Sequence, residues 1–172
     1  MPISILVGYA TNYGSTQEVA ENIAVTLREH GFLVDVQPLR EVRTLAEYHA
    51  VVMGAPLFMF HWHKDAIRFL ARYREALVER PVAVFALGPV RDPHDEKEWQ
   101  DARARLTKEL DRFPWFKPIT RGVFGGRLDP ASLRFPFKMF ARKMQASDLR
   151  DWAAIHTWTE ELATRLASLL LR

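Results

Sequence analysis

Residues 3–20 read ISILVGYATNYGSTQEVA, a short apolar run followed by a polar loop and then by a helical pattern. The run Ile3–Tyr9 is continuous rather than alternating, which is typical of a strand buried on both faces of a parallel sheet. Apolar residues then recur at the spacing of one helix face, at Val19, Ala20, Ile23, Ala24 and Leu27. The stretch predicts a buried strand that passes through a polar loop directly into a helix.

The same unit is repeated along the chain. Continuous apolar runs predict three more buried strands, and a more polar run predicts an edge strand; these are Ala50–Ala55, Val82–Gly88, Ile119–Gly125 and Phe32–Val36. Helical periods separate the strands, although Leu39–Tyr48 is long enough for only two or three turns of a crossover helix. Alternating strands and helices predict an α/β fold, a doubly wound parallel sheet of five strands with helices on both faces. We expect one domain over residues 1–172.

Composition narrows the class of protein further. Of the 172 residues, 48% are hydrophobic and 26% are charged, the mix of an ordinary folded domain, and the absence of cysteine excludes disulfides, thiolate nucleophiles and cysteine-ligated clusters. Stretches without a charge or histidine, such as Ala50–Phe60, are shorter than the roughly 20 residues that span a bilayer. No signal-peptide pattern precedes the first strand. We expect a soluble cytoplasmic protein.

The polar loop after the first strand is the strongest candidate for a binding site. Hydroxyls, an amide and a glycine precede a helix N-terminus, where free N–H groups bind anions; the residues are Thr11, Asn12, Tyr13, Gly14, Ser15 and Thr16. The loop has no Lys or Arg for a nucleoside triphosphate and no Gly-x-Gly-x-x-Gly for a dinucleotide. It therefore predicts a site for a terminal monophosphate. The alternative is that Ser15 or Thr16 only caps the helix.

This loop resembles the phosphate loop of the flavodoxin family. Its aromatic, hydroxyl and small positions match at Tyr9, Thr11, Gly14, Thr16 and Ala20, whereas Gly8 stands where the family usually has a larger apolar residue. The resemblance implies the strand order 2-1-3-4-5 and a non-covalently bound FMN, with its phosphate at Thr11–Thr16.

The loops after the third and fourth strands would then hold the flavin ring, because a flat apolar ring needs apolar walls and backbone groups at its edge. The residues are Pro56, Leu57, Phe58, Met59 and Phe60 in one loop and Gly88, Pro89, Val90 and Arg91 in the other. Phe58, Phe60 and Trp62 can all provide walls. His61 and His63 lack a third ligand nearby, so we predict helix-entry or ligand-contact roles and no metal site. Asp92, Asp95 and Glu96 are expected to be solvated.

Within this group the chain is most similar to the menaquinone-dependent protoporphyrinogen dehydrogenases of bacterial haem synthesis. The likeness rests on Gly54-Ala55 followed by His61-Trp62-His63, on Gly125-Gly126-Arg127-Leu128, and on Asp148-Leu149-Arg150-Asp151-Trp152. It implies an FMN-dependent oxidoreductase that transfers electrons or hydride through flavin N5 from a porphyrinogen to a quinone, without a catalytic protein side chain. The alternatives are a flavodoxin-type electron-transfer protein that docks on redox partner proteins, and a flavin-binding sensor.

An insert at about 127–147 carries a net charge of +4, whereas the whole chain carries +3. Pro136 is a plausible helix start, and Arg134, Lys138 and Arg142 follow one another at a spacing of four, which predicts a short basic amphipathic helix. Such a helix would contact an anionic membrane at its inner face, peripherally, or an anionic substrate. The alternative is a surface helix that covers the sheet edge. No nucleic-acid recognition motif accompanies it, so no nucleic-acid partner is predicted.

Overall fold

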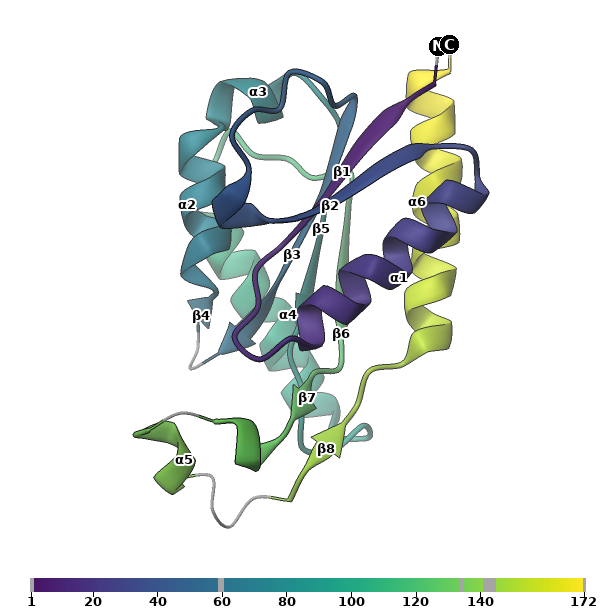
Figure 1. Cartoon of the computed structure of the whole chain (residues 1–172). Coiled ribbons are helices and arrows are strands. Elements are labelled where there is room, and N and C mark those ends of the chain that lie inside the picture. The colour runs from purple at the N-terminus through teal and green to yellow at the C-terminus, as the bar shows by residue number, and fades with distance from the viewer. Residues whose placement is uncertain (1, 59–60, 134, 141–144, 172) are drawn as a thin grey trace.

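The computed structural model describes residues 2–58, 61–133, 135–140 and 145–171 (Figure 1). The strands are β1 (Ser4–Tyr9), β2 (Leu33–Pro38), β3 (Ala50–Phe58), β4 (His61–Trp62), β5 (Val82–Leu87), β6 (Thr120–Phe124), β7 (Arg127–Leu128) and β8 (Ser147–Asp148). The α-helices are α1 (Ser15–Glu29), α2 (Lys64–Arg72), α3 (Arg74–Val78), α4 (Glu96–Leu110), α5 (Phe137–Phe140) and α6 (Trp152–Leu170). Two short 3-10 turns are η1 (Leu39–Glu41) and η2 (Pro130–Ser132).

The main sheet has five parallel strands in the order β2-β1-β3-β5-β6, which confirms the expected strand order and places β2 at an edge. The short β4 folds back antiparallel on the end of β3. The order changes direction between β1 and β3, and their pairing runs from Ile5 opposite Ala50 to Tyr9 opposite Gly54. The loops that leave the carboxyl ends of these two strands therefore diverge at one point of the sheet edge, which is where open α/β sheets bind ligands.

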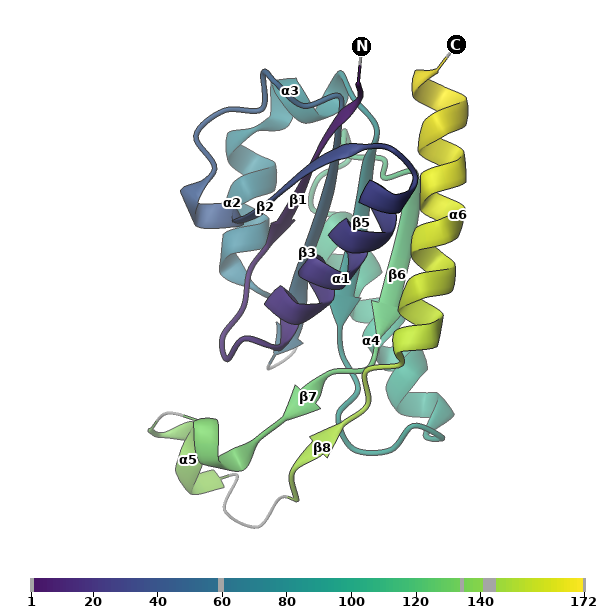
Figure 2. The same ribbon diagram turned by 45° about the vertical axis from the view of Figure 1, so that its right-hand side comes forward.

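Helices cover both faces of the sheet. Helices α1 and α6 lie on one face, and α2, α3 and α4 lie on the other (Figures 1 and 2). Neighbouring strand residues enter different cores, since Val52 and Phe85 pack beneath α1 and α6 while Met53 and Val84 pack on the opposite side. Burial on both faces explains why the strands read as continuous apolar runs.

The crossover between β2 and β3 differs from the predicted helix. Only η1 is helical, and the chain then continues with Val42, Leu45 and Tyr48 buried against the α2 side of the sheet. The Arg80 guanidinium donates to the backbone oxygens of Leu45 and Tyr48. In place of the two or three helical turns for which the segment was barely long enough, residues 39–48 form one 3-10 turn followed by irregular chain.

The insert begins and ends as a two-stranded antiparallel ribbon, with Arg127 opposite Asp148 and Leu128 opposite Ser147. The ribbon leaves the carboxyl edge of the sheet and carries α5 away from it (Figure 2). Of the predicted basic helix, the described residues include α5 (Phe137–Phe140); Arg134 and Arg142 lie outside the described residues. Among the described helices, none has the length and hydropathy needed to cross a membrane.

Candidate functional site

The loop after β1 is organised by a turn. The Gly14 N–H donates to Thr11 Oγ1 at 2.8 Å, and Gly14 has a φ of 92°, in the left-handed region that glycine tolerates best. Gly14 is also the N-cap of α1, and no side chain caps the first turn. The alternative that Ser15 or Thr16 is only a helix cap is therefore wrong, because both residues lie inside α1 and leave its N–H groups free for a ligand.

Thr16 has a buried hydroxyl that no described residue pairs with. Its side chain is fully buried, and Oγ1 has no hydrogen-bond partner among the described residues. Leaving a buried polar group unpaired costs about 1–3 kcal/mol, so such groups are rare without a reason. A hydroxyl in the first turn of a helix, beside free N–H groups and the positive end of the helix dipole, suits a phosphate oxygen. The loop therefore fits the phosphate end of FMN.

A cavity of about 150 Å³ opens where this loop meets the ends of β3 and β5 and the base of the insert. The predicted site residues that line it are Asn12, Tyr13, Ser15, Pro56, Leu57, Phe58, Gly88 and Val90. Five other predicted residues do not line it, namely Thr11, Gly14, Thr16, Pro89 and Arg91. Met59 and Phe60 lie outside the described residues. Three loops far apart in sequence thus surround one space.

The insert forms a wall of this cavity that the sequence reasoning did not assign. Its contribution consists of Gly126, Arg127, Leu128, Asp129 and Leu133. The Gly126 N–H donates to the Pro89 oxygen at 2.8 Å, and Ser147 Oγ donates to the Val90 oxygen, so both ends of the ribbon are attached to the loop after β5. A β-carbon on Gly125 would lie 2.0 Å from the Leu149 oxygen, which requires glycine there. In the sequence, this wall was indicated by the motif Gly125-Gly126-Arg127-Leu128. Which residues the motif contacts depends on the pairing of β7 with β8.

The loop after β3 is a hairpin that directs its aromatic side chains to opposite faces. Leu57 pairs with Trp62 and Phe58 pairs with His61, so alternate side chains point to opposite faces. Trp62 is only 2% exposed, and its Nε1 donates to the Ala55 oxygen at 2.9 Å. The expectation that Trp62 walls the flavin site is wrong, because the hairpin turns it into the core. Phe58 remains 36% exposed and lines the cavity.

The two histidines of this loop have separate surroundings. His63 Nδ1 accepts from the Asp65 N–H at 3.0 Å, so His63 caps α2, and burial lowers its pKa. His61 Nδ1 lies 3.4 Å from Glu109 Oε1 on α4. A helix-entry role was one of the two predicted for the pair, and His63 has that role. In the loop after β5, Asp92, Asp95 and Glu96 are exposed, and Asp95 caps α4 by accepting from the Glu98 N–H.

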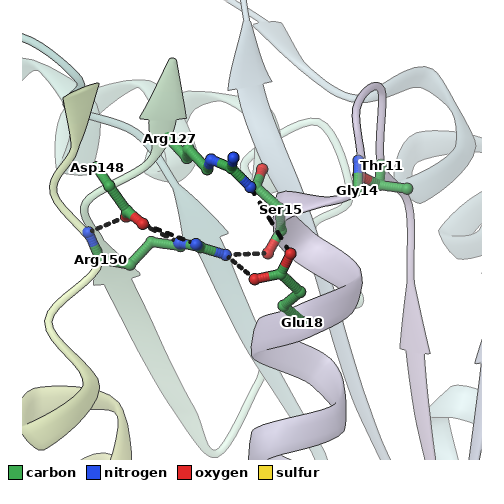
Figure 3. A network of polar contacts seen from close by, with 7 residues as sticks. All are labelled: Thr11, Gly14, Ser15, Glu18, Arg127, Asp148 and Arg150. Carbon is green, nitrogen blue, oxygen red and sulfur yellow. Dashed lines mark hydrogen bonds and ion pairs between the residues drawn. The ribbon is translucent and has the colours of Figure 1, made fainter. Parts of the chain in front are cut away.

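A buried arginine joins the insert to the phosphate-type loop (Figure 3). The Arg150 side chain is 5% exposed and donates to both carboxylate oxygens of Asp148, at 2.9 and 2.7 Å. Its Nη1 also donates to Glu18 Oε2 at 2.8 Å and to the Ser15 backbone oxygen at 3.3 Å. These hydrogen bonds lower the pKa of Asp148, and the same bonds raise the pKa of Arg150. The network fixes the start of α1 relative to the ribbon.

Arg127 adds a positive charge that the loop itself lacks. It extends from β7 toward the start of α1, where its Nη1 lies 3.8 Å from Glu18 Oε1, and it lines the cavity together with Ser15 (Figure 3). Its side chain is 43% exposed. The sequence places this residue more than a hundred positions after Ser15. The ribbon therefore brings a cation beside the loop Thr11–Thr16, which has no Lys or Arg of its own.

Comparison with known proteins identifies the family of this chain. A flavodoxin-domain family profile matches residues 6–148, and the chain belongs to this family. Among curated proteins it is similar to the protoporphyrinogen IX dehydrogenase [quinone] of Escherichia coli (strain K12), with 28% identity over 134 residues that cover 76% of this chain and 70% of the relative.

Solved structures agree on the fold. An oxidised flavodoxin 1 from Bacillus cereus superimposes with a TM-score of 0.61 at 15% identity, covering 95% of this chain and 99% of that one. A flavodoxin from the domain Archaea gives 0.56 at 15% identity, with the same coverage. The family and the fold together support a flavin-type redox function.

Proposed function

We propose that this chain is an FMN-dependent oxidoreductase that takes electrons from a porphyrinogen and passes them to a quinone. The cavity between the loops after β1, β3 and β5 and the insert carries the proposal. Thr16 Oγ1, the first-turn N–H groups and Ser15 would hold the phosphate, and Pro56–Phe60 and Gly88–Arg91 would flank the ring. When bound, FMN supplies hydride or paired-electron transfer through N5.

The protein side chains bind, orient and exclude water in this scheme. Leu57, Phe58, Leu128 and Leu133 give the cavity apolar walls from opposite sides. Arg127 offers a positive charge beside Ser15, and Arg150 holds that loop in place. The wall provided by the insert favours a small-molecule reactant over a protein that docks on an open flavin edge. The name of the Escherichia coli relative supports a porphyrinogen as donor and a quinone as acceptor.

The visible spectrum of the purified protein, with mass analysis of the molecule released on heating, tests the cofactor. We expect a yellow protein that releases FMN. The flavin colour should bleach when protoporphyrinogen is added anaerobically and return with menadione. A colourless protein that does not bind added FMN would refute the proposal, and a yellow protein that exchanges electrons only with a reductase would instead be a flavodoxin-type carrier.

The insert is also proposed to contact an anionic membrane surface peripherally. Phe135 is 78% exposed and Met139 is 58% exposed, and the exposed cation Lys138 lies between them in sequence. Apolar side chains beside a cation favour the interface of an anionic bilayer. This contact would bring the cavity close to a quinone dissolved in the membrane.

A further inference from the structure

A second cavity adjoins the first. It measures about 530 Å³, within the usual range for small-molecule sites, and it shares Asn12 and Phe58 with the flavin cavity. The rest of its described lining comes from β4, from the start of α2 and the residue before it, and from the end of α4 and the residues just after it. A molecule in this space would therefore extend toward the proposed flavin ring along Phe58.

The charge of this second cavity is positive. Its described lining includes the cations Lys64, Arg68 and Arg112 and the single carboxylate Glu109. Glu109 is 8% exposed at its side chain and is already engaged, because Arg112 Nη1 lies 3.3 Å from its Oε2 and His61 Nδ1 lies 3.4 Å from its Oε1. The pair of Glu109 and Arg112 cancels, so Lys64 and Arg68 remain as the excess charge.

Lys64 and Arg68 are placed to act together. They are four residues apart on α2 and so project from the same side of the helix. Neither forms an ion pair with any residue in the described parts of the chain, and both are exposed. Two unpaired cations on one helix face match two carboxylates on one ligand.

Most of the remaining surface of the cavity is apolar, although Asn12, His61 and His63 also line it. Ile67 lies between the two cations in sequence, and Phe58 forms another part of the lining, with the buried Trp62 behind it. The indole N–H of Trp62 already donates to a backbone oxygen, so it needs no hydrogen bond from a ligand. An apolar body with carboxylates at one end satisfies both parts of this surface.

We propose that this second cavity is the electron-donor site, in which Lys64 and Arg68 pair with two carboxylates of an apolar donor whose body extends past Phe58 toward the flavin cavity. The inference rests on the proposed function of the first cavity. It assigns Lys64 and Arg68 of α2 to the substrate, and the sequence alone had given neither residue a ligand. A porphyrin with two propionates has the required chemistry.

The test compares two double variants of the FMN-loaded protein with equal loss of charge. Lys64→Gln with Arg68→Gln removes the two cations of the cavity. Arg103→Gln with Lys108→Gln removes two exposed cations of α4 outside the described lining of either cavity. Equilibrium dialysis then measures the Kd of protoporphyrin IX and of its dimethyl ester, both delivered from the same dilute non-ionic detergent.

We expect the cavity variant to bind protoporphyrin IX about tenfold more weakly than the wild type, the scale of two partly exposed ion pairs. Its affinity for the uncharged ester should not change, and the α4 variant should stay within about twofold of the wild type for both probes. Equal affinities of the two double variants for protoporphyrin IX would overturn the donor site, as would a wild type that holds FMN and binds no protoporphyrin IX.

The FMN affinity of every sample is measured by fluorescence titration alongside the dialysis. A wild type that binds no FMN would overturn the proposed function and the donor site together. Retained FMN affinity in the cavity variant, together with the expected loss of protoporphyrin IX, supports both and shows that the variant is folded.

Discussion

Replacing Arg150 with Met removes the guanidinium that joins the insert to the start of α1 and keeps most of the length of the side chain. The wild-type side chain is 5% exposed and makes charged hydrogen bonds to Asp148 and Glu18 and a further bond to the Ser15 oxygen. We expect the variant to fold less stably and to bind FMN less tightly.

The loss of unfolding free energy depends on whether the carboxylates that Arg150 leaves behind can be solvated by water. Breaking a fully buried ion pair costs about 3–5 kcal/mol because the remaining charge stays unpaired. Asp148 and Glu18 are 43% and 50% exposed, so water can take over their free oxygens, and the cost falls to about 2 kcal/mol. For a chain of this size 1 kcal/mol corresponds to about 2–4 °C, so the Tm should fall by about 4–8 °C.

Urea unfolding and thermal unfolding, both followed by circular dichroism without FMN, measure this cost. The control is Arg103→Met, since Arg103 is exposed and contributes to neither described cavity lining. A second measurement is the Kd of FMN, which should rise about fivefold because the Ser15 backbone is no longer held in place before binding. An unfolding free energy within about 0.5 kcal/mol of the wild type would refute the proposed role of the network.

Three further predictions concern the phosphate-type loop, the ribbon and the insert. Thr16→Val should weaken FMN binding by about 1–2 kcal/mol in a fluorescence titration without destabilising the FMN-free protein, because the hydroxyl has no partner there; an unchanged Kd would contradict the phosphate placement. Asp148 has a pKa lowered below its ordinary value of 3.8, so its charge stabilises the fold above about pH 4, and this contribution is lost as the pH falls through the lowered pKa. Urea unfolding should therefore find Asp148→Asn less stable than the wild type at about pH 7 and should find the difference shrinking toward about pH 3; a constant difference would be inconsistent with this linkage. Serine at Arg134, Lys138 and Arg142 should reduce co-sedimentation with anionic vesicles and its salt sensitivity, with neutral vesicles as control; unchanged sedimentation would remove the membrane contact.

Much of the fold was predictable because its signals are local. A continuous apolar run means burial on both faces, and Ile3–Tyr9 and Val82–Gly88 became β1 and β5 with boundaries shifted by a residue or so. The crossover at Leu39–Tyr48 was mispredicted as helical, and two of its carbonyls, those of Leu45 and Tyr48, accept from Arg80 on a distant segment. Local pattern carries no information about such a partner.

The candidate site was also predictable only where its signals are local. The loop Thr11–Thr16 was recognisable because hydroxyls and a glycine beside a helix start have a meaning that depends only on neighbours in sequence. Phe58 and Trp62 were indistinguishable as flavin walls, because the choice between core and cavity depends on the pairing of Leu57 with Trp62 in a hairpin.

The amino-acid order was sufficient for the five strands of the main sheet, for α1, α4 and α6, and for the polar loop, since each depends on residues within about one turn or one strand of each other. The insert wall, the cations Arg127 and Arg150 beside Ser15, and the grouping of Lys64 and Arg68 with Arg112 depended on packing. Charges that far apart in the chain become neighbours only when buried helices and strands hold them there, because unscreened attraction between exposed charges extends only about 10 Å in salt.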